Sequence, residues 1–150
     1  MPLLLCLLAC STTSSTTPLS DHLLGELTFQ TASEEVRVFP ISVADSPEER
    51  ERGLMGVESL GRDAGMVFVF QDQVSDPFWM KDTLIPLSIA FWNDDGVIID
   101  ILEMEPCLQD SCPTYVPSLP YTYALEMNAG WFEHRDIAPG DHVDVRILTE

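Results

Sequence analysis

The sequence predicts a mostly-β protein, a single antiparallel β-sandwich or distorted barrel with one or two short helices. Three observations support this fold class. From residue 66 onward, short apolar runs rich in β-branched and aromatic residues alternate with short polar turns. Helix signals are confined to one or two short segments. The length of 150 residues, 45% of them apolar, suits one domain with one hydrophobic core.

Residues 1–9 are apolar and are followed abruptly by small polar residues, which is the pattern of an export signal. This run is too short to span a bilayer. Leu7, Leu8, Ala9 and Cys10 resemble the bacterial lipobox, in which the cysteine is lipidated and becomes the new N-terminus. We therefore expect a signal peptide over residues 1–9 and a lipidated Ser/Thr-rich tether over residues 10–21, with Cys10 as the membrane anchor.

Two features depart from an ordinary signal peptide. No Lys or Arg precedes the apolar run, and the run is short against the usual length of roughly 15–30 residues. A start codon assigned too far downstream would explain both. The expected location is the cell envelope, in the periplasm or on the outer surface. A cleaved secretion signal and a cytosolic protein with an apolar N-terminus are the alternatives.

Residues 22–150 are expected to form the β domain. Residues 27–29 and 36–43 have the composition and partial alternation of half-buried strands. Pro40 predicts an edge strand or a bulge, because proline cannot donate a hydrogen bond to a sheet.

One short helix is predicted over residues 46–55. Ser46 suits the N-cap, Pro47 suits the first helical position, and Gly53 suits the helix end. Arg52 should lie at the edge of the surface that this helix covers.

The rest of the chain is predicted to be strands joined by turns. The asparagine and glycine of residues 93–96 indicate a hairpin between two of these strands. A second short helix is expected at residues 130–137. The predicted strands are residues 66–70, 77–80, 87–92, 97–104, 121–127 and 142–148.

The charge of the chain limits the classes of partner that it can bind. A formal charge of −18, from 25 acidic and 7 basic residues, excludes a nucleic-acid partner, because phosphate backbones require a Lys/Arg surface. The three histidines are not at metal-ligand spacing, and no glycine-rich phosphate loop is present. We expect neither a metal nor a cofactor.

Lys81, Asp82 and Thr83 interrupt the long apolar run of residues 76–91. Charged groups inside such a run are expected to be paired or to lie at an opening to solvent. Strand alternation would send Trp79 and Lys81 to one face and Met80 and Asp82 to the other. Three roles are open for Lys81. The functional ones are binding of an anionic group and action as an acid or base beside Asp82 or Glu126. The structural one is capping of the core by pairing with Glu126.

Three segments also identify a family. The run Phe78-Trp-Met-Lys-Asp-Thr-Leu-Ile-Pro-Leu87, with Arg52-Gly-Leu-Met55 and Pro120-Tyr-Thr-Tyr-Ala-Leu-Glu126, resembles the bacterial and archaeal family called domain of unknown function 192. The resemblance covers about residues 36–147 and implies a mostly-β domain without naming a reaction. It places Trp79 beside the Lys81 corner, and the family commonly has Asn at the position of Asp82.

These observations give one set of candidate ligand-binding residues. Flat aromatic rings beside a few polar groups are typical of small-molecule sites. The set is Arg52, Trp79, Lys81, Asp82, Tyr115 and Glu126.

Cys107 and Cys112 have three interpretations. A disulfide bridge fits an exported protein and is the preferred one. Together with Met104, the two cysteines also offer the soft ligands of a Cu(I) site. A redox-active dithiol is the third, although the spacing is not Cys-x-x-Cys.

The preferred function is a cell-envelope lipoprotein domain that binds a small molecule or an envelope partner through the candidate residues. A hydrolase using Lys81 with Glu126 or Asp82 is the alternative, but no nucleophile is evident and an enzyme is not favoured. A periplasmic copper or redox accessory protein using Met104, Cys107 and Cys112 is the second alternative.

Overall fold

A computed structural model describes residues 22–148 of the chain. The predicted signal peptide, the lipidation at Cys10 and the tether of residues 10–21 therefore lie outside the described residues. No helix in the described part is long and apolar enough to cross a membrane.

The described residues form a mostly-β structure, as predicted. All the predicted strands are present, most of them within one or two residues of their expected ends. β1 begins four residues earlier than predicted, β3 ends four residues later, and β7 was not predicted. The elements are β1 (Leu23–Gln30), β2 (Glu35–Ala44), α1 (Pro47–Arg52), β3 (Gly65–Val74), β4 (Phe78–Trp79), β5 (Leu87–Trp92), β6 (Ile98–Met104), β7 (Thr114–Tyr115), β8 (Tyr121–Asn128), the 3-10 helix η2 (Glu133–Arg135) and β9 (His142–Leu148).

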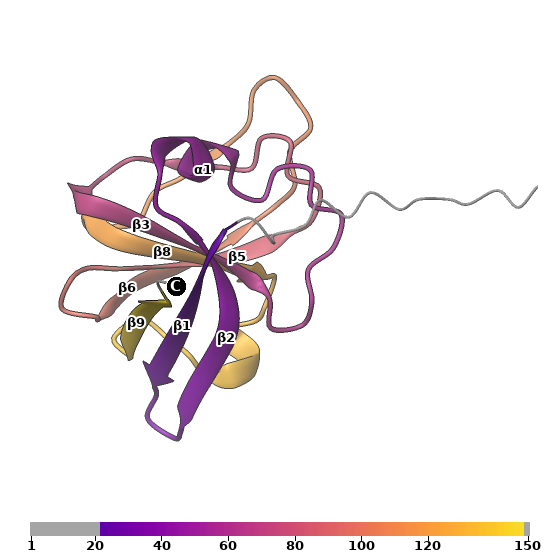
Figure 1. The fold of residues 1–150 in the computed structure, drawn as a ribbon. Coiled ribbons are helices and arrows are strands. Elements are labelled where there is room, and N and C mark those ends of the chain that lie inside the picture. The colour runs from indigo at the N-terminus through magenta and orange to yellow at the C-terminus, as the bar shows by residue number, and fades with distance from the viewer. Residues whose placement is uncertain (1–21, 149–150) are drawn as a thin grey trace, which may run out of the picture.

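Seven strands form one curled sheet in the order β6-β5-β8-β3-β2-β1-β9, and β4 pairs with β7 in a separate two-stranded sheet. The strands fan around a common centre, and α1 lies at the end of the sheet opposite the β1–β2 turn (Figure 1). The expectation of a wholly antiparallel sheet is wrong at one place, because β2 and β3 are parallel. A parallel pair needs a crossover of a dozen or more residues, and residues 45–64, which include α1, supply it.

The curled sheet comes close to a barrel. The edge strands β6 and β9 meet at one end through an antiparallel bridge between Val97 and His142, and Val143 donates a backbone hydrogen bond of 2.7 Å to Gly96. A sandwich is not confirmed, because the second sheet in the described part of the chain has only two short strands. Pro40 lies at a bulge of β2, where the register with β1 shifts, as its position in the sequence predicts.

The sheet packs a hydrophobic core on each face. The core inside the curl includes residues of both edge strands, Ile98 and Val143, and is closed by Trp131 and Phe132 after β8. The second core covers the other face of β3, β8 and β5, under α1 and the β4–β7 pair. Neighbouring residues of β3 show the division, because Val67 belongs to the inner core and Phe68 to the outer one. All the candidate site residues lie on this outer side.

Candidate functional site

The interruption at residues 81–83 is a tight turn beside β4. Trp79 is 47% exposed while Met80 is fully buried, so alternation holds up to this point. It ends at Asp82, which is exposed and has a positive φ of 55°. Asp and Asn are the non-glycine residues that best tolerate this backbone region. The turn therefore accepts either residue, which accounts for Asp82 where the resemblance leads us to expect Asn.

Two other segments hold this turn in place. The Asp82 amide donates to the carbonyl of Cys107 at 3.0 Å, and the Gly56 amide donates to the carbonyl of Asp82 at 2.9 Å. Lys81 and Thr83 both form β-bridges with Cys107. The turn thus joins the cysteine loop to the segment that follows α1.

The sulfur atoms of Cys107 and Cys112 lie 2.09 Å apart, which is disulfide-bonding distance, as the preferred interpretation predicts. Met104 is buried in the outer core with Cys107. Bonded sulfurs cannot serve as thiolate ligands, so this geometry does not support the copper site. No cluster of three metal-ligating His, Cys, Asp or Glu side chains is found among residues 22–148.

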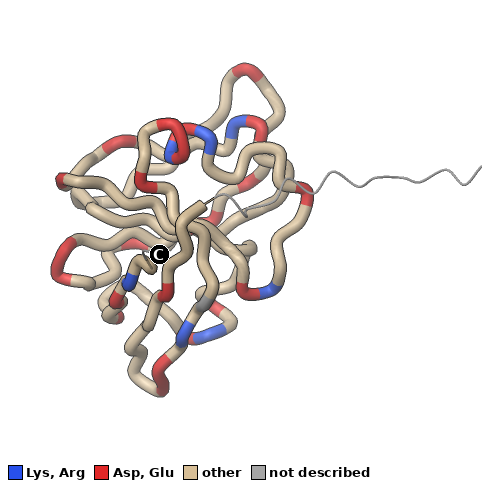
Figure 2. Tube along the Cα trace, in the orientation of Figure 1, with Lys and Arg blue, Asp and Glu red and all other residues tan. Residues whose placement is uncertain are grey.

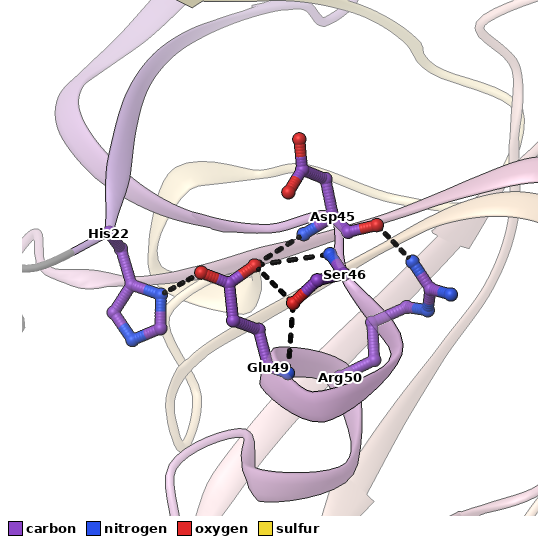
Figure 3. A network of polar contacts seen from close by, with 5 residues as sticks. All are labelled: His22, Asp45, Ser46, Glu49 and Arg50. Carbon is purple, nitrogen blue, oxygen red and sulfur yellow. Dashed lines mark hydrogen bonds and ion pairs between the residues drawn. The ribbon is translucent and has the colours of Figure 1, made fainter.

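Helix α1 supplies the other wall of the site, and its ends are firmly fixed. Ser46 caps the helix in a capping box with Glu49, and Gly53 ends it with a φ of 47°, as predicted. Glu49 also lies 3.3 Å from Nδ1 of the buried His22 (Figure 3). Arg50 donates to the carbonyls of Asp45 and Val69, so the helix is tied to β3 as well.

Three hollows adjoin the exposed ring of Trp79. The aromatic groove has a volume of about 480 Å³ and is lined by Phe68, Phe78 and Tyr121 among others. The Lys81 pocket, of about 380 Å³, lies between Lys81, Asp82 and Arg52. The Glu126 shaft, of about 30 Å³, runs between α1 and β4 down to Glu126. Trp79 and Glu51 line all three hollows.

Glu126 lies on β8 between β3 and β5, and its neighbours across the sheet are Met66 and Ile89. Its side chain is only 4% exposed. No hydrogen-bond donor or ion-pair partner to its carboxyl is found among the described residues. Burial raises the pKa of Glu126 to about 8, so the group is largely protonated at neutral pH.

The structure brings most of the candidate residues together. Arg52, Trp79, Lys81 and Asp82 share the Lys81 pocket, and Arg52 and Trp79 also line the Glu126 shaft. Tyr115 lines none of the three hollows. It pairs with Phe78 across the β4–β7 sheet, and its hydroxyl accepts a hydrogen bond from the Glu105 amide.

The expected ion pair between Lys81 and Glu126 is not formed. Lys81 makes no ion pair within residues 22–148, and its Nζ lies 6.0 Å from the centre of the Trp79 ring. The two residues also line different hollows. Lys81 therefore neither caps the core through Glu126 nor shares a reaction centre with it in this structure.

Sequence reasoning missed several residues of the site. Glu51 has the pattern of an ordinary exposed helix residue, and Phe68 and Phe78 have the pattern of core residues. Their place beside Trp79 follows from α1 lying over β3. Figure 2 shows acidic positions spread over the whole trace, while several basic positions lie close together at the α1 end.

Comparison with known proteins identifies relatives of the same fold. The family model DUF192, described as "Uncharacterized ACR", matches residues 28–145. A crystal structure from Sinorhizobium meliloti, of a protein with a suggested role as a transcription regulator, is 30% identical with a TM-score of 0.74, and the match covers 83% of this chain and 95% of that one. A protein of unknown function from Novosphingobium aromaticivorans is 28% identical with a TM-score of 0.72, over 79% and 83% of the two chains. Among curated proteins, none matches the sequence.

Proposed function

The chain belongs to the uncharacterised DUF192 family, and we propose that it is a small-molecule-binding domain of an exported, membrane-anchored protein. The observation that carries the binding function is the meeting of three hollows at the exposed ring of Trp79. The aromatic groove alone has about 480 Å³, within the range of roughly 300–1,000 Å³ that is usual for ligand pockets. This volume favours a small molecule over a protein partner from the envelope.

The two alternative functions lack a comparable observation. Lys81 and Glu126 line different hollows, so they do not form the paired acid and base that hydrolysis would need. The bonded sulfurs of Cys107 and Cys112 leave no thiolate for copper. The role suggested for the S. meliloti relative is not carried over, because a net charge of −18, from 25 acidic and 7 basic residues, disfavours contact with the phosphate backbone of DNA.

The binding proposal predicts that Trp79 reports on the occupied site. Trp92 and Trp131 are 1% and 4% exposed, so quenching of fluorescence by acrylamide should come mainly from Trp79. Compounds that bind should protect this fluorescence and raise the melting temperature in a screen of sugars, amines and carboxylates.

Two variants distinguish binding at Trp79 from a general stabilising effect of a compound on the protein. Trp79→Ala should abolish the melting-temperature shift. Leu119→Ala should keep it, because Leu119 is 60% exposed but lines none of the three hollows. Equal stabilisation of the Trp79→Ala variant, or no protective compound in the screen, would contradict a binding site at Trp79.

The membrane anchor is a separate part of the proposal and rests on the lipobox-like residues that end at Cys10. Bacteria expressing the chain and fed an alkyne fatty acid should incorporate the label into the protein. Cys10→Ser should remove the label, while Cys6→Ser should not. Labelling that survives Cys10→Ser would refute the anchor without affecting the binding proposal.

A further inference from the structure

The polar groups around Trp79 indicate which class of ligand the site accepts. Resting on the binding function above, we propose that the site takes a small organic carboxylate whose anionic group lies between Arg52 and the carboxyl group of Glu126, with Lys81 in the adjoining pocket. The apolar body of such a ligand would occupy the aromatic groove. Four features of the site support this assignment: its unpaired cations, its buried acid, the charges facing that acid, and its apolar wall.

The first feature is a pair of cations without partners. Arg52 and Lys81 form no ion pair within residues 22–148, although Glu48, Glu51 and Asp82 line the same pocket. Three arginines do find carboxylates, namely Arg37, Arg135 and Arg146, whereas Arg50 and Arg62 form no ion pair within the described residues. In a chain with such an excess of acidic residues, two unpaired cations beside one exposed aromatic ring favour an external anion.

The second feature is the buried acid at the base of the shaft. A protonated carboxylic acid donates a hydrogen bond, so at neutral pH Glu126 can serve as a donor to a ligand oxygen instead of repelling it. The shaft holds about 30 Å³, room for roughly one water molecule or one polar group of that size. One carboxylate oxygen fits this space.

The third feature is the charge that faces Glu126. The strands on either side of it place uncharged residues, Met66 and Ile89, at the paired positions. Among the shaft residues the charged ones besides Glu126 all come from α1, and they are Arg50, Glu51 and Arg52. Their sum is one positive charge above a neutral acid, which favours an anion over an ammonium group in the shaft itself. The groove and the Lys81 pocket add Glu48, Asp72, Asp76 and Asp82, so the positive charge is confined to the shaft end of the site.

The fourth feature is the wall that the groove and the shaft share. Phe68, Phe78 and Trp79 line both hollows, so a ligand with its polar end in the shaft would lay its body on aromatic rings. Burial of such a body is favourable because it removes apolar surface from water. A carboxylate that carries an aromatic or branched apolar group therefore fits best.

Three probes of similar shape and different charge test the assignment by calorimetry on the full chain: phenylacetate, phenylacetamide and phenethylamine. At pH 7 phenylacetate should bind at least tenfold more tightly than the other two. Its affinity should be about tenfold weaker at pH 9 than at pH 7, because Glu126 must keep its proton to donate.

Variants identify the groups responsible. Arg52→Gln should weaken phenylacetate binding by about tenfold, the scale of one charge-assisted hydrogen bond, and Lys81→Gln should weaken it by less, because Lys81 lines the adjoining pocket and not the shaft. Arg62→Gln is the matched control: Arg62 also has no ion pair within the described residues, but it lines none of the three hollows, so its loss should leave affinity unchanged. Glu126→Gln keeps a donor and should bind within a few-fold at pH 7 while losing the pH dependence.

Two outcomes would overturn the assignment. Tighter binding of the amine or the amide, dependent on Trp79, would reject the carboxylate class while leaving the binding site intact. If none of the three probes binds, the carboxylate class is rejected too. The existence of the binding site is tested separately by the Trp79 screen. Circular dichroism and melting of each variant show that a lost affinity does not reflect a lost fold.

Discussion

Replacing Glu126 by glutamine should change the free energy of unfolding by less than about 1 kcal/mol near pH 5 and raise it by on the order of 4 kcal/mol at pH 8. The folded chain keeps the Glu126 proton up to a pKa of about 8, whereas the unfolded chain releases it near the ordinary value of 4.5. Between these values the folded state binds more protons, so the stability of the natural protein falls as pH rises. The slope is about 1.4 kcal/mol per pH unit over roughly 3.5 units.

Urea denaturation of both proteins at pH 5, 6, 7 and 8 measures this difference directly. The comparison removes the general effect of the −18 charge, because both proteins carry nearly the same surface. Glu58→Gln, at an exposed position, is the control and should shift stability by less than about 0.5 kcal/mol at every pH. A Glu126→Gln effect of equal size at pH 5 and pH 8 would show that Glu126 is ionised in the folded protein.

The local features of the fold were predictable because short-range physics determines them. Ser46, Pro47 and Gly53 define α1 through hydrogen bonds within a few residues, and Pro40 marks its bulge because it has no amide hydrogen. The parallel pairing of β2 with β3 was not foreseen, although a helix between two apolar strands is the usual pattern of a parallel crossover.

The site was predictable only in part, for a related reason. Trp79, Lys81 and Asp82 are adjacent in sequence, and their polar interruption of an apolar run was visible. Glu126 was visible as a single acid within an apolar strand, but its separation from Lys81 depends on how α1 and β4 pack over β8. Tyr115 was grouped with the cluster but lines none of the three hollows, and strand β7, in which it pairs with Phe78, gives no sequence signal of its own.

Backbone hydrogen bonds link the turn of residues 81–83 to the loop of residues 107–112. The carbonyl of Cys107 accepts the Asp82 amide, and the carbonyl of Asp82 accepts the Gly56 amide, so the segment after α1, the turn and the loop are connected in series. Lys81 stands on the turn, and Arg52 ends α1 just before the connected segment. We therefore expect opening of the Cys107–Cys112 loop to loosen the turn that carries Lys81.

Replacing both Cys107 and Cys112 by serine should lower the free energy of unfolding by about 2–3 kcal/mol, the usual effect of a disulfide that closes a short loop. Urea denaturation checks this value in a background in which Cys6 and Cys10 are already serine, so that no other thiol contributes. Dithiothreitol should destabilise the parent by a similar amount and leave the double variant unchanged. A loss below about 0.5 kcal/mol would show that the bridge does not constrain the domain.

Hydrogen exchange at single amides tests whether the loss reaches the site. Opening the loop removes the constraint on the Cys107 carbonyl, so the Asp82 and Gly56 amides should exchange at least tenfold faster in the double variant under conditions where global unfolding does not contribute. The Ala90 amide, at the centre of β5 between β6 and β8, should keep its rate under the same conditions. Faster exchange at Ala90 but not at Asp82 would mean that the disulfide stabilises the sheet and not the turn that carries Lys81.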